Sequence, residues 1–269
     1  MEWTPDAKAA LQHVPFFVRK RVRARVEKEA TDAGKERVSL ADVKATQTRY
    51  LSRMHADIKG FQLDTCFGPS GCPNRAVVSD QLLARAETAI KAADLLSFLK
   101  SRVAGDLKFH HEFRVTLADC PNACSQPQIK DVGIIGAAVP ETTHEACSQC
   151  NACVESCPEQ AIALAAESRL PGIDTRRCLN CGQCIRACPT GTIAEARRGF
   201  RVQLGGRLGR HPRLARELPG IFSEDQVLDI LQDCFKLYKE RSLHGERFSQ
   251  LFQDRDFEEF SRRFRGAAV

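Results

Sequence analysis

The sequence has no long apolar segment and no export-type start. Its longest uninterrupted apolar run, Val132 to Val139, is far shorter than the roughly 20 residues that a membrane-spanning helix needs. The first residues, Met1 to Pro5, show no basic region followed by an apolar stretch, so no secretory signal peptide is expected. We therefore expect a cytoplasmic protein without a membrane span, in which thiols stay reduced and a disulfide framework is disfavoured.

A strong excess of one charge is also missing. Forty Lys and Arg residues against 34 Asp and Glu leave a net charge of +6, which is too small to indicate nucleic-acid binding by itself. In the basic stretch near the N-terminus, acids such as Glu27 and Glu29 interrupt the positive face, so we expect no nucleic-acid partner. Of the 269 residues, 43% are hydrophobic and 28% charged, which excludes disorder, collagen and coiled coil for the whole chain.

What the chain does have is thirteen cysteines, eight of them in a tandem repeat of C-x2-C-x2-C-x3-C-P. Three thiolates at this spacing bind one iron–sulfur cubane, and the fourth thiolate of each run binds the other cubane. The repeat predicts two 4Fe-4S clusters, one held by Cys147, Cys150, Cys153 and Cys188 and the other by Cys178, Cys181, Cys184 and Cys157. Zinc sites or unligated thiols are the alternative. The repeat resembles bacterial two-cluster ferredoxins over residues 141–195, which implies an inserted module where electrons enter.

Four further cysteines form a second, rarer pattern. Cys66 and Cys72 make a C-x5-C pair, and Cys120 and Cys124 make a C-x3-C pair, both in loops that contain proline. Two loops with two thiolates each can hold one more cubane, and the glycines of the first loop let its backbone approach closely. We therefore expect three 4Fe-4S clusters, with the thirteenth cysteine, Cys234, buried in a helix and unligated.

The second pattern resembles the siroheme–4Fe-4S site of the sulfite and nitrite reductase family. The likeness starts at Cys-Pro-Asn-Ala-Cys (120–124), continues through 128–136 and resumes over 199–212. It implies that siroheme is bound and that Cys124 bridges the cluster to the siroheme iron. It also implies six-electron reduction of a small oxyanion, sulfite in preference to nitrite, with electrons from a donor protein. Dissimilatory and anaerobic members of the family carry a similar ferredoxin insertion.

Basic residues are expected around such a cofactor because siroheme is a polycarboxylate. Residues 197–216 contain seven arginines and no acid. We predict that Arg207, Arg210 and Arg213 bind siroheme, since arginine offers permanently charged, bidentate donors to carboxylates. Lys130, Arg207 and Arg210 are the candidates for holding the oxyanion beside Cys124. A solvated basic loop is the alternative for any one of these arginines.

The sequence departs from the family in two ways. Ala118-Asp119 precedes Cys120, where the family usually has Ser-Gly, and the chain has room for one of the two related halves of a full-length siroheme reductase. It is most similar to the small assimilatory-type members. Two alternatives stay open. One is a non-catalytic multi-cluster electron-transfer protein that lacks siroheme and docks to a larger reductase through residues 1–60. The other is a siroheme-binding subunit whose missing half comes from a partner or from a second copy.

The expected fold class is α+β in three parts. Residues 1–60 should form a helical domain, which resembles the C-terminal domain of the light-independent protochlorophyllide reductase B subunit through Trp3–Ala7 and Val14–Arg19. Residues 61–140 and 196–269 should form the siroheme-reductase-like half, a mixed sheet with helices, and 141–195 the ferredoxin module. Within that half we expect helices over 80–100, after a capping box at Ser223, and along the C-terminal phenylalanines. Strands are expected over 111–117, 132–139 and 200–204, and a turn-rich segment over 61–78.

Overall fold

The computed structural model describes residues 1–56, 58–164 and 169–266, which form two compact units, Met1–Ile58 and Lys59–Val269. Helices and strands are mixed along the chain, which confirms the predicted α+β class. Among the described residues, no helix is long and apolar enough to cross a membrane.

The described residues of the first unit are mainly helical, as expected for the segment 1–60. The helices are α1 (Pro5–Gln12), α2 (Phe16–Asp32) and α3 (Leu40–Ala56), joined by a parallel pair of two-residue strands, β1 (Glu2–Trp3) and β2 (Arg37–Val38). Thr4 caps α1, since its hydroxyl accepts a hydrogen bond from the Ala7 backbone N–H at 3.4 Å. A small core forms from Trp3, Ala7, Leu11, Val26, Ala30, Val38 and Val43.

The start of α3 is held by a reciprocal cap. The Ser39 hydroxyl accepts from the Asp42 backbone N–H at 3.4 Å, and the Asp42 carboxylate accepts from the Ser39 backbone N–H at 2.9 Å. Lys35 also donates a hydrogen bond to Asp42. This bond is the largest cause, and the bonds from Ser39 the next, of the fall in the pKa of Asp42 from 3.8 to about 2. Because the folded pKa is the lower one, this stabilisation is present above pH 3.8 and is lost as the pH falls through about 2.

We therefore expect Asp42→Asn to destabilise the protein by about 1 kcal/mol at neutral pH, the usual cost of a lost cap. Between pH 3.8 and about 2 the variant should lose helicity less steeply than the wild type, because it lacks the titrating carboxylate. Far-UV circular dichroism of the full chain measures both effects. The control is Asp32→Asn, at an exposed carboxylate at the end of α2. If both variants followed the same acid profile, the Asp42 assignment would be refuted.

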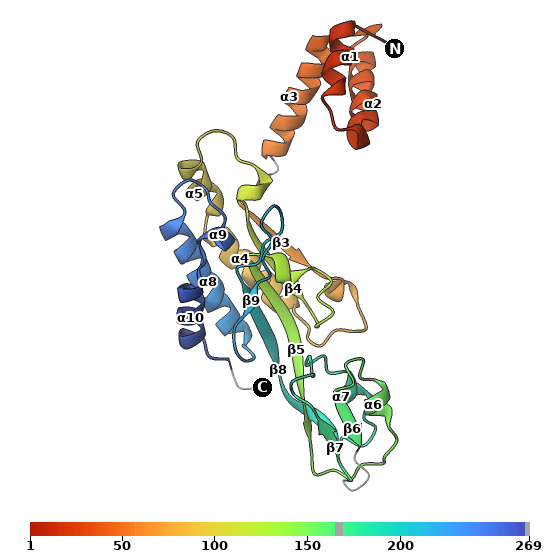
Figure 1. Cartoon of the computed structure of the whole chain (residues 1–269), viewed down its shortest axis with the longest axis vertical. Coiled ribbons are helices and arrows are strands. Elements are labelled where there is room, and N and C mark those ends of the chain that lie inside the picture. The colour runs from red at the N-terminus through yellow and green to blue at the C-terminus, as the bar shows by residue number, and fades with distance from the viewer. Residues whose placement is uncertain (57, 165–168, 267–269) are drawn as a thin grey trace. The chain divides into compact units, whose positions relative to one another are not determined.

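The second unit is built on a five-stranded mixed sheet with the strand order β3-β4-β5-β8-β9 (Figure 1). The strands are β3 (Phe61–Thr65), β4 (Phe113–Ala118), β5 (Val132–Thr142), β8 (Ile193–Leu204) and β9 (Arg216–Glu217). The first three are parallel to one another, whereas β8 is antiparallel to both β5 and β9. The prediction of a turn-rich start over 61–78 was wrong for β3, whose short alternation was too weak to indicate a strand.

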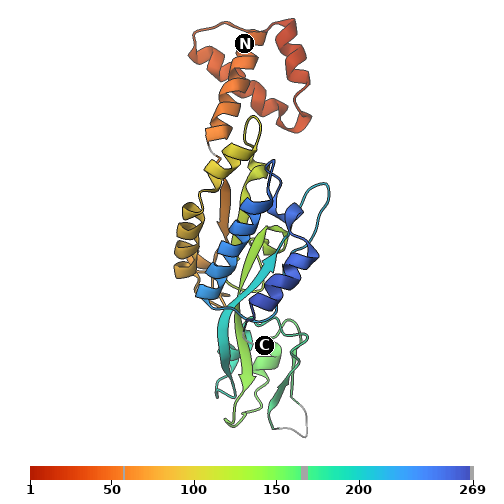
Figure 2. The ribbon, with the colours of Figure 1, turned by 90° about the vertical axis from the view of Figure 1, so that its left-hand side faces the viewer.

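Helices cover one face of this sheet (Figure 2). They are α4 (Asp80–Ala92), α5 (Leu95–Arg102), α8 (Glu224–Arg241), α9 (Phe248–Leu251) and α10 (Asp254–Arg263). Alternate strand residues such as Val115, Ile134 and Val202 pack against them in one core, which includes Cys234, buried as predicted. The single helix expected over 80–100 is two helices, because Asp94 adopts a left-handed conformation (φ 42°) and caps α5. The capping box at Ser223 is confirmed.

The opposite face of the sheet carries the other alternate residues, among them Asp64, Arg114 and Thr116. Because β4 and β5 are parallel, the chain between them must return from the carboxyl end of β4 to the opposite end of the sheet, where β5 begins. This crossover connection contains no α-helix. The Thr116 hydroxyl donates to the Asp64 and Ser125 carbonyls at 3.1 and 3.4 Å, so this crossover runs over the polar face. Three short 3-10 helices, η1 (Gly68–Ser70), η2 (Phe109–His111) and η3 (Pro127–Ile129), complete the loops.

Strands β5 and β8 are longer than predicted and form an antiparallel hairpin beyond the helices (Figure 1). The pairing shifts at Val139/Pro140 and continues to Thr142 opposite Ile193. Between them the chain forms α6 (Ala152–Glu155), β6 (Ile162–Leu164), β7 (Pro171–Ile173) and α7 (Gln183–Ala187), with β6 and β7 antiparallel. The strands thus cross both boundaries, 140 and 196, that the sequence suggested for the inserted segment.

Candidate metal centres and anion site

Two cysteine loops begin at the carboxyl ends of neighbouring strands of the sheet. Cys66 directly follows β3, and Cys120 follows β4 two residues after Ala118. These strands are parallel neighbours that pair Thr65 with Leu117, so their carboxyl ends coincide. The Cys66 backbone N–H donates to the Leu117 carbonyl at 3.0 Å. The topology therefore brings together two cysteine pairs that are far apart in the sequence.

The four thiols of these loops gather in one place. Cys120 is buried, Cys66 and Cys72 are partly buried, and Cys124 is exposed. Burial raises the pKa of Cys120, and the nearby thiols of Cys66, Cys124 and Cys72 raise it further. The backbone N–H groups of Gly68 and Asp119 donate to the Cys66 sulfur at 3.2 and 3.3 Å. Such bonds to sulfur tune the potential of a cluster that a thiolate holds.

Asp119, which departs from the family pattern, ties the two loops together. Its buried carboxylate accepts from Arg75 Nε and the Ser79 hydroxyl, both at 2.5 Å. A Cβ atom on Gly68 would lie 2.1 Å from Asp119 Oδ2, so the first loop can approach only because residue 68 is glycine. Asp119 therefore has its own partners, which fix the position of the residue before Cys120.

The eight cysteines of the repeat line two separate cavities. One is lined by Cys157, Cys178, Cys181 and Cys184, and the other by Cys147, Cys150, Cys153 and Cys188. Each cavity thus takes three cysteines from one run and the last cysteine of the other. Within the described residues, no three His, Cys, Asp or Glu side chains are grouped as around a single metal ion. The thiols surround a volume, which is the arrangement that a cubane requires.

The two runs have matching backbones. Gln149 and Asn180, each two residues after the first cysteine of its run, adopt left-handed conformations (φ 55° and 59°). Their N–H groups donate to Cys147 and Cys178 sulfurs at 3.4 and 3.5 Å. The last cysteines of the two runs accept from Ala161 and Ile193 N–H groups, both at 3.3 Å. The repeated sequence therefore gives repeated N–H donors aimed at sulfur.

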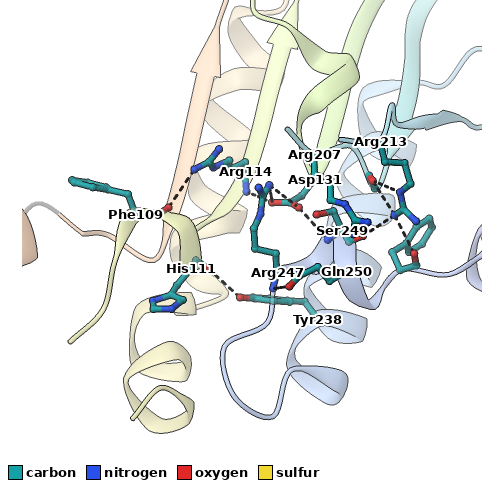
Figure 3. Close-up of polar contacts among 12 residues, drawn as sticks. Phe109, His111, Arg114, Asp131, Arg207, Arg213, Tyr238, Arg247, Ser249 and Gln250 are labelled. Carbon is teal, nitrogen blue, oxygen red and sulfur yellow. Dashed lines mark hydrogen bonds and ion pairs between the residues drawn. The ribbon is translucent and has the colours of Figure 1, made fainter. Parts of the chain in front are cut away.

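A group of cations lies around Asp131, the residue that directly precedes β5 (Figure 3). The fully buried Asp131 carboxylate accepts from the backbone N–H groups of Arg114 and Ser249 at 2.9 and 3.1 Å. Arg247 pairs with the same carboxylate at 3.3 Å, and the Arg114 guanidinium extends toward the Phe109 carbonyl. The Nε atoms of Arg114 and Arg247 are buried and have no hydrogen-bond partner in the part of the chain that the structure describes.

Burial and neighbouring positive charges shift the pKa values of two basic residues in this group. Burial, followed by the nearby Arg247, lowers the pKa of Arg114. Burial, followed by Lys108, Arg114 and Arg247, also lowers the pKa of His110. The Arg247 guanidinium pairs with the Asp131 carboxylate and the Arg114 guanidinium with the Phe109 carbonyl, and both can still bind an anion, because charge-assisted hydrogen bonds form at the unused N–H positions. Sequence reasoning missed both arginines, although Arg114 stands out as a charged residue in an otherwise uncharged strand.

Three of the basic residues predicted to bind cofactor or substrate, Lys130, Arg207 and Arg213, have partners within the chain. Arg213 donates to the carbonyls of Gly205, Ser249 and Phe252 at 2.8–3.1 Å, and Arg207 donates to the Ser249 carbonyl at 3.0 Å. These bonds attach the loop of residues 205–213 to α9 (Figure 3). Lys130 pairs with Asp64 at 2.6 Å, whereas Arg210 is exposed. Roles of Lys130, Arg207, Arg210 and Arg213 in anion binding stay predictions.

Comparison with known proteins decides the family. The model of the nitrite and sulphite reductase 4Fe-4S domain matches residues 68–267. The chain belongs to this family. The predicted family is therefore confirmed. Residues 3–46 match the model described as the proto-chlorophyllide reductase 57 kD subunit, which confirms the second resemblance.

Two curated relatives of this sulfite and nitrite reductase-type chain carry sulfite reductase in their names. The coenzyme F420-dependent sulfite reductase of Methanocaldococcus jannaschii is 36% identical over 128 residues, 48% of this chain and 20% of the relative. A subunit of the anaerobic sulfite reductase of Salmonella typhimurium is 30% identical over 133 residues, 48% of this chain and 40% of the relative. The matches thus span less than half of either relative. The crystal structure of dissimilatory sulfite reductase I shares the fold, with a TM-score of 0.50 and 16% identity over 77% of this chain and 52% of that one.

Proposed function

We propose that the chain is a siroheme-dependent sulfite reductase, or the catalytic subunit of one, that binds three 4Fe-4S clusters. The observation that carries the proposal is the gathering of four thiols from two loops, with Cys124 outermost. A soft, exposed thiolate beside a cubane site fits the iron of a macrocycle. The names of the curated relatives favour sulfite over nitrite.

The position of each cysteine determines which cluster it would hold. Cys66, Cys72, Cys120 and Cys124 would hold the cluster that adjoins siroheme, and the cysteines of the repeat would hold the other two. Siroheme, when bound, would supply a Lewis-acidic iron for the six-electron reduction of the oxyanion. The crossover loop leads from these cysteines to Asp131, which accepts a hydrogen bond from the Arg114 backbone N–H and pairs with Arg247.

The cations at the other end of the crossover loop have two roles. The uncompensated N–H groups of Arg114 and Arg247 would attract and orient the oxyanion or the carboxylates of the macrocycle. The exposed Arg210 would reach the same anions, and Lys130 could do so after leaving Asp64. Burial lowers the pKa of His110, which favours the neutral imidazole beside these cations.

Partners follow from the same proposal. Electrons would come from a cytoplasmic donor protein to the ferredoxin-like segment. A second protein chain, or a second copy of this one, would cover the polar face of the sheet, in keeping with the Salmonella relative, which is named as one subunit of its enzyme.

The test is the content of the protein as purified without oxygen from a host that makes siroheme. We expect strong absorbance in the red from the macrocycle and about twelve iron atoms per chain from three cubanes, in addition to the siroheme iron. Iron at that level with no tetrapyrrole would refute siroheme binding and favour the multi-cluster electron carrier. Four or eight cubane irons would refute the number of clusters.

A further inference from the structure

Strand β5 passes between the two cysteine regions with small side chains. A Cβ atom on Gly136 would lie 2.6 Å from the Asp119 carbonyl, and one on Gly182 would lie 2.9 Å from the Ala138 Cβ. Ala138 also donates its backbone N–H to the Asn180 carbonyl at 2.8 Å, which pairs it with Cys181 in a parallel bridge. The second cysteine run is therefore attached directly to the sheet.

Ala138 also contacts the site that contains Cys120. Ala138 packs with Cys120 and Ala76 in a small apolar cluster, and Ile185, the residue after Cys184, lies against it. On the surface beside this contact, Arg186 donates to the Arg75 carbonyl at 3.1 Å. Arg75 in turn pairs with Asp119, the neighbour of Cys120. Helix α7 therefore contacts the Cys120 loop through an apolar cluster and is connected to it by a polar contact through Arg75.

The first cysteine run has a different setting. Its cavity is lined by residues of the β6–β7 pair and of the turn after α7, among them Leu164, Pro171 and Thr190. The two cavities of the segment share an apolar cluster that includes Cys153 and Cys184. The cavity lined by Cys178, Cys181 and Cys184 thus adjoins the Cys120 loop. The cavity lined by Cys147, Cys150 and Cys153 adjoins only the first cavity among the contacts described.

We propose that the site of Cys157, Cys178, Cys181 and Cys184 is the immediate electron donor to the site of Cys66, Cys72, Cys120 and Cys124. The site of Cys147, Cys150, Cys153 and Cys188 is the point of entry, and Ala138 and Arg186 hold the junction closed. This inference rests on the proposed clusters. At each transfer one electron leaves a reduced cubane, which is oxidised, and reduces the next one. A low-potential one-electron carrier protein resupplies the entry site, and no covalent bond forms or breaks.

The experiment uses the full chain, loaded anaerobically with all clusters. Ala138→Leu inserts a larger side chain at the junction, and Arg186→Gln removes the hydrogen bond to Arg75 without touching the buried contact. The matched control is Glu155→Gln, which lies at the equivalent position of the first run and is exposed. Iron and acid-labile sulfide are measured first, so that failure to assemble three clusters is recorded as failure of the proposed function.

Electron paramagnetic resonance of the loaded proteins then tests the junction. After rapid mixing with dithionite and freezing, Ala138→Leu should hold the third cluster oxidised at times when the wild type has reduced it, while the two repeat clusters reduce normally. The spin–spin splitting between the third cluster and its neighbour should be lost. Arg186→Gln should show the same change in smaller degree, and Glu155→Gln none. Normal splitting and normal timing in Ala138→Leu with three clusters present would overturn the assigned order.

Discussion

Replacement of Cys124 by serine is expected to abolish sulfite reduction and the red absorbance of siroheme. The thiol of Cys124 is the exposed one of its group, and a serine oxygen is a harder and poorer ligand for iron. The clusters of the repeat should survive, because their cysteines line two separate cavities. Visible spectra, iron content and reduction of sulfite with an artificial electron donor measure the three outcomes.

The matched control for this prediction is Cys150→Ser, which changes an exposed cysteine within the repeat. This variant should lose one repeat cluster while the red bands of siroheme stay. Normal sulfite turnover by the Cys124 variant would show that this cysteine does not bridge cluster and macrocycle.

Removal of the Asp131 carboxylate should have the largest effect on folding. Asp131→Ala leaves Arg247 without its buried counter-charge and strands the backbone N–H groups of Arg114 and Ser249. Breaking a buried ion pair in this way costs about 3–5 kcal/mol of unfolding free energy. Urea unfolding followed by far-UV circular dichroism measures the loss.

Asp64→Ala is the comparison for that measurement, because Asp64 also pairs with a cation on the polar side of the sheet but is half-exposed. An exposed pair contributes about 0–1 kcal/mol. Equal destabilisation by the two changes would contradict the anchoring role of Asp131.

Local signals in the sequence were sufficient for much of the fold. Ser223 caps a helix where its spacing indicates, and the cysteines of the repeat line two cavities in the grouping that the spacing suggests. Strand β3 was missed because only Phe61 and Leu63 mark its buried face. The break at Asp94 was missed because a left-handed residue within an apolar helical pattern leaves no periodic signal.

The cation group shows what the sequence could not provide. Asp131 and Arg247 are 116 positions apart, and only the packing of the loop before α9 beside β5 brings them together. The sequence showed that positive charge is concentrated near position 207, but it could not show which groups these arginines bind. Backbone carbonyls compete with any cofactor for guanidinium groups, and the loop geometry decides in favour of the carbonyls for Arg213.

The hairpin of β5 and β8 has a consequence for how such chains can be rearranged. Its pairing is regular up to Val139 opposite Arg197, and the irregularity falls immediately after it. A tight turn at that point would close the ladder and leave every core strand in place. The segment beyond it could therefore be gained, exchanged or discarded as a cassette in evolution or in the laboratory, without disturbing the scaffold that aligns Cys66 with Cys120.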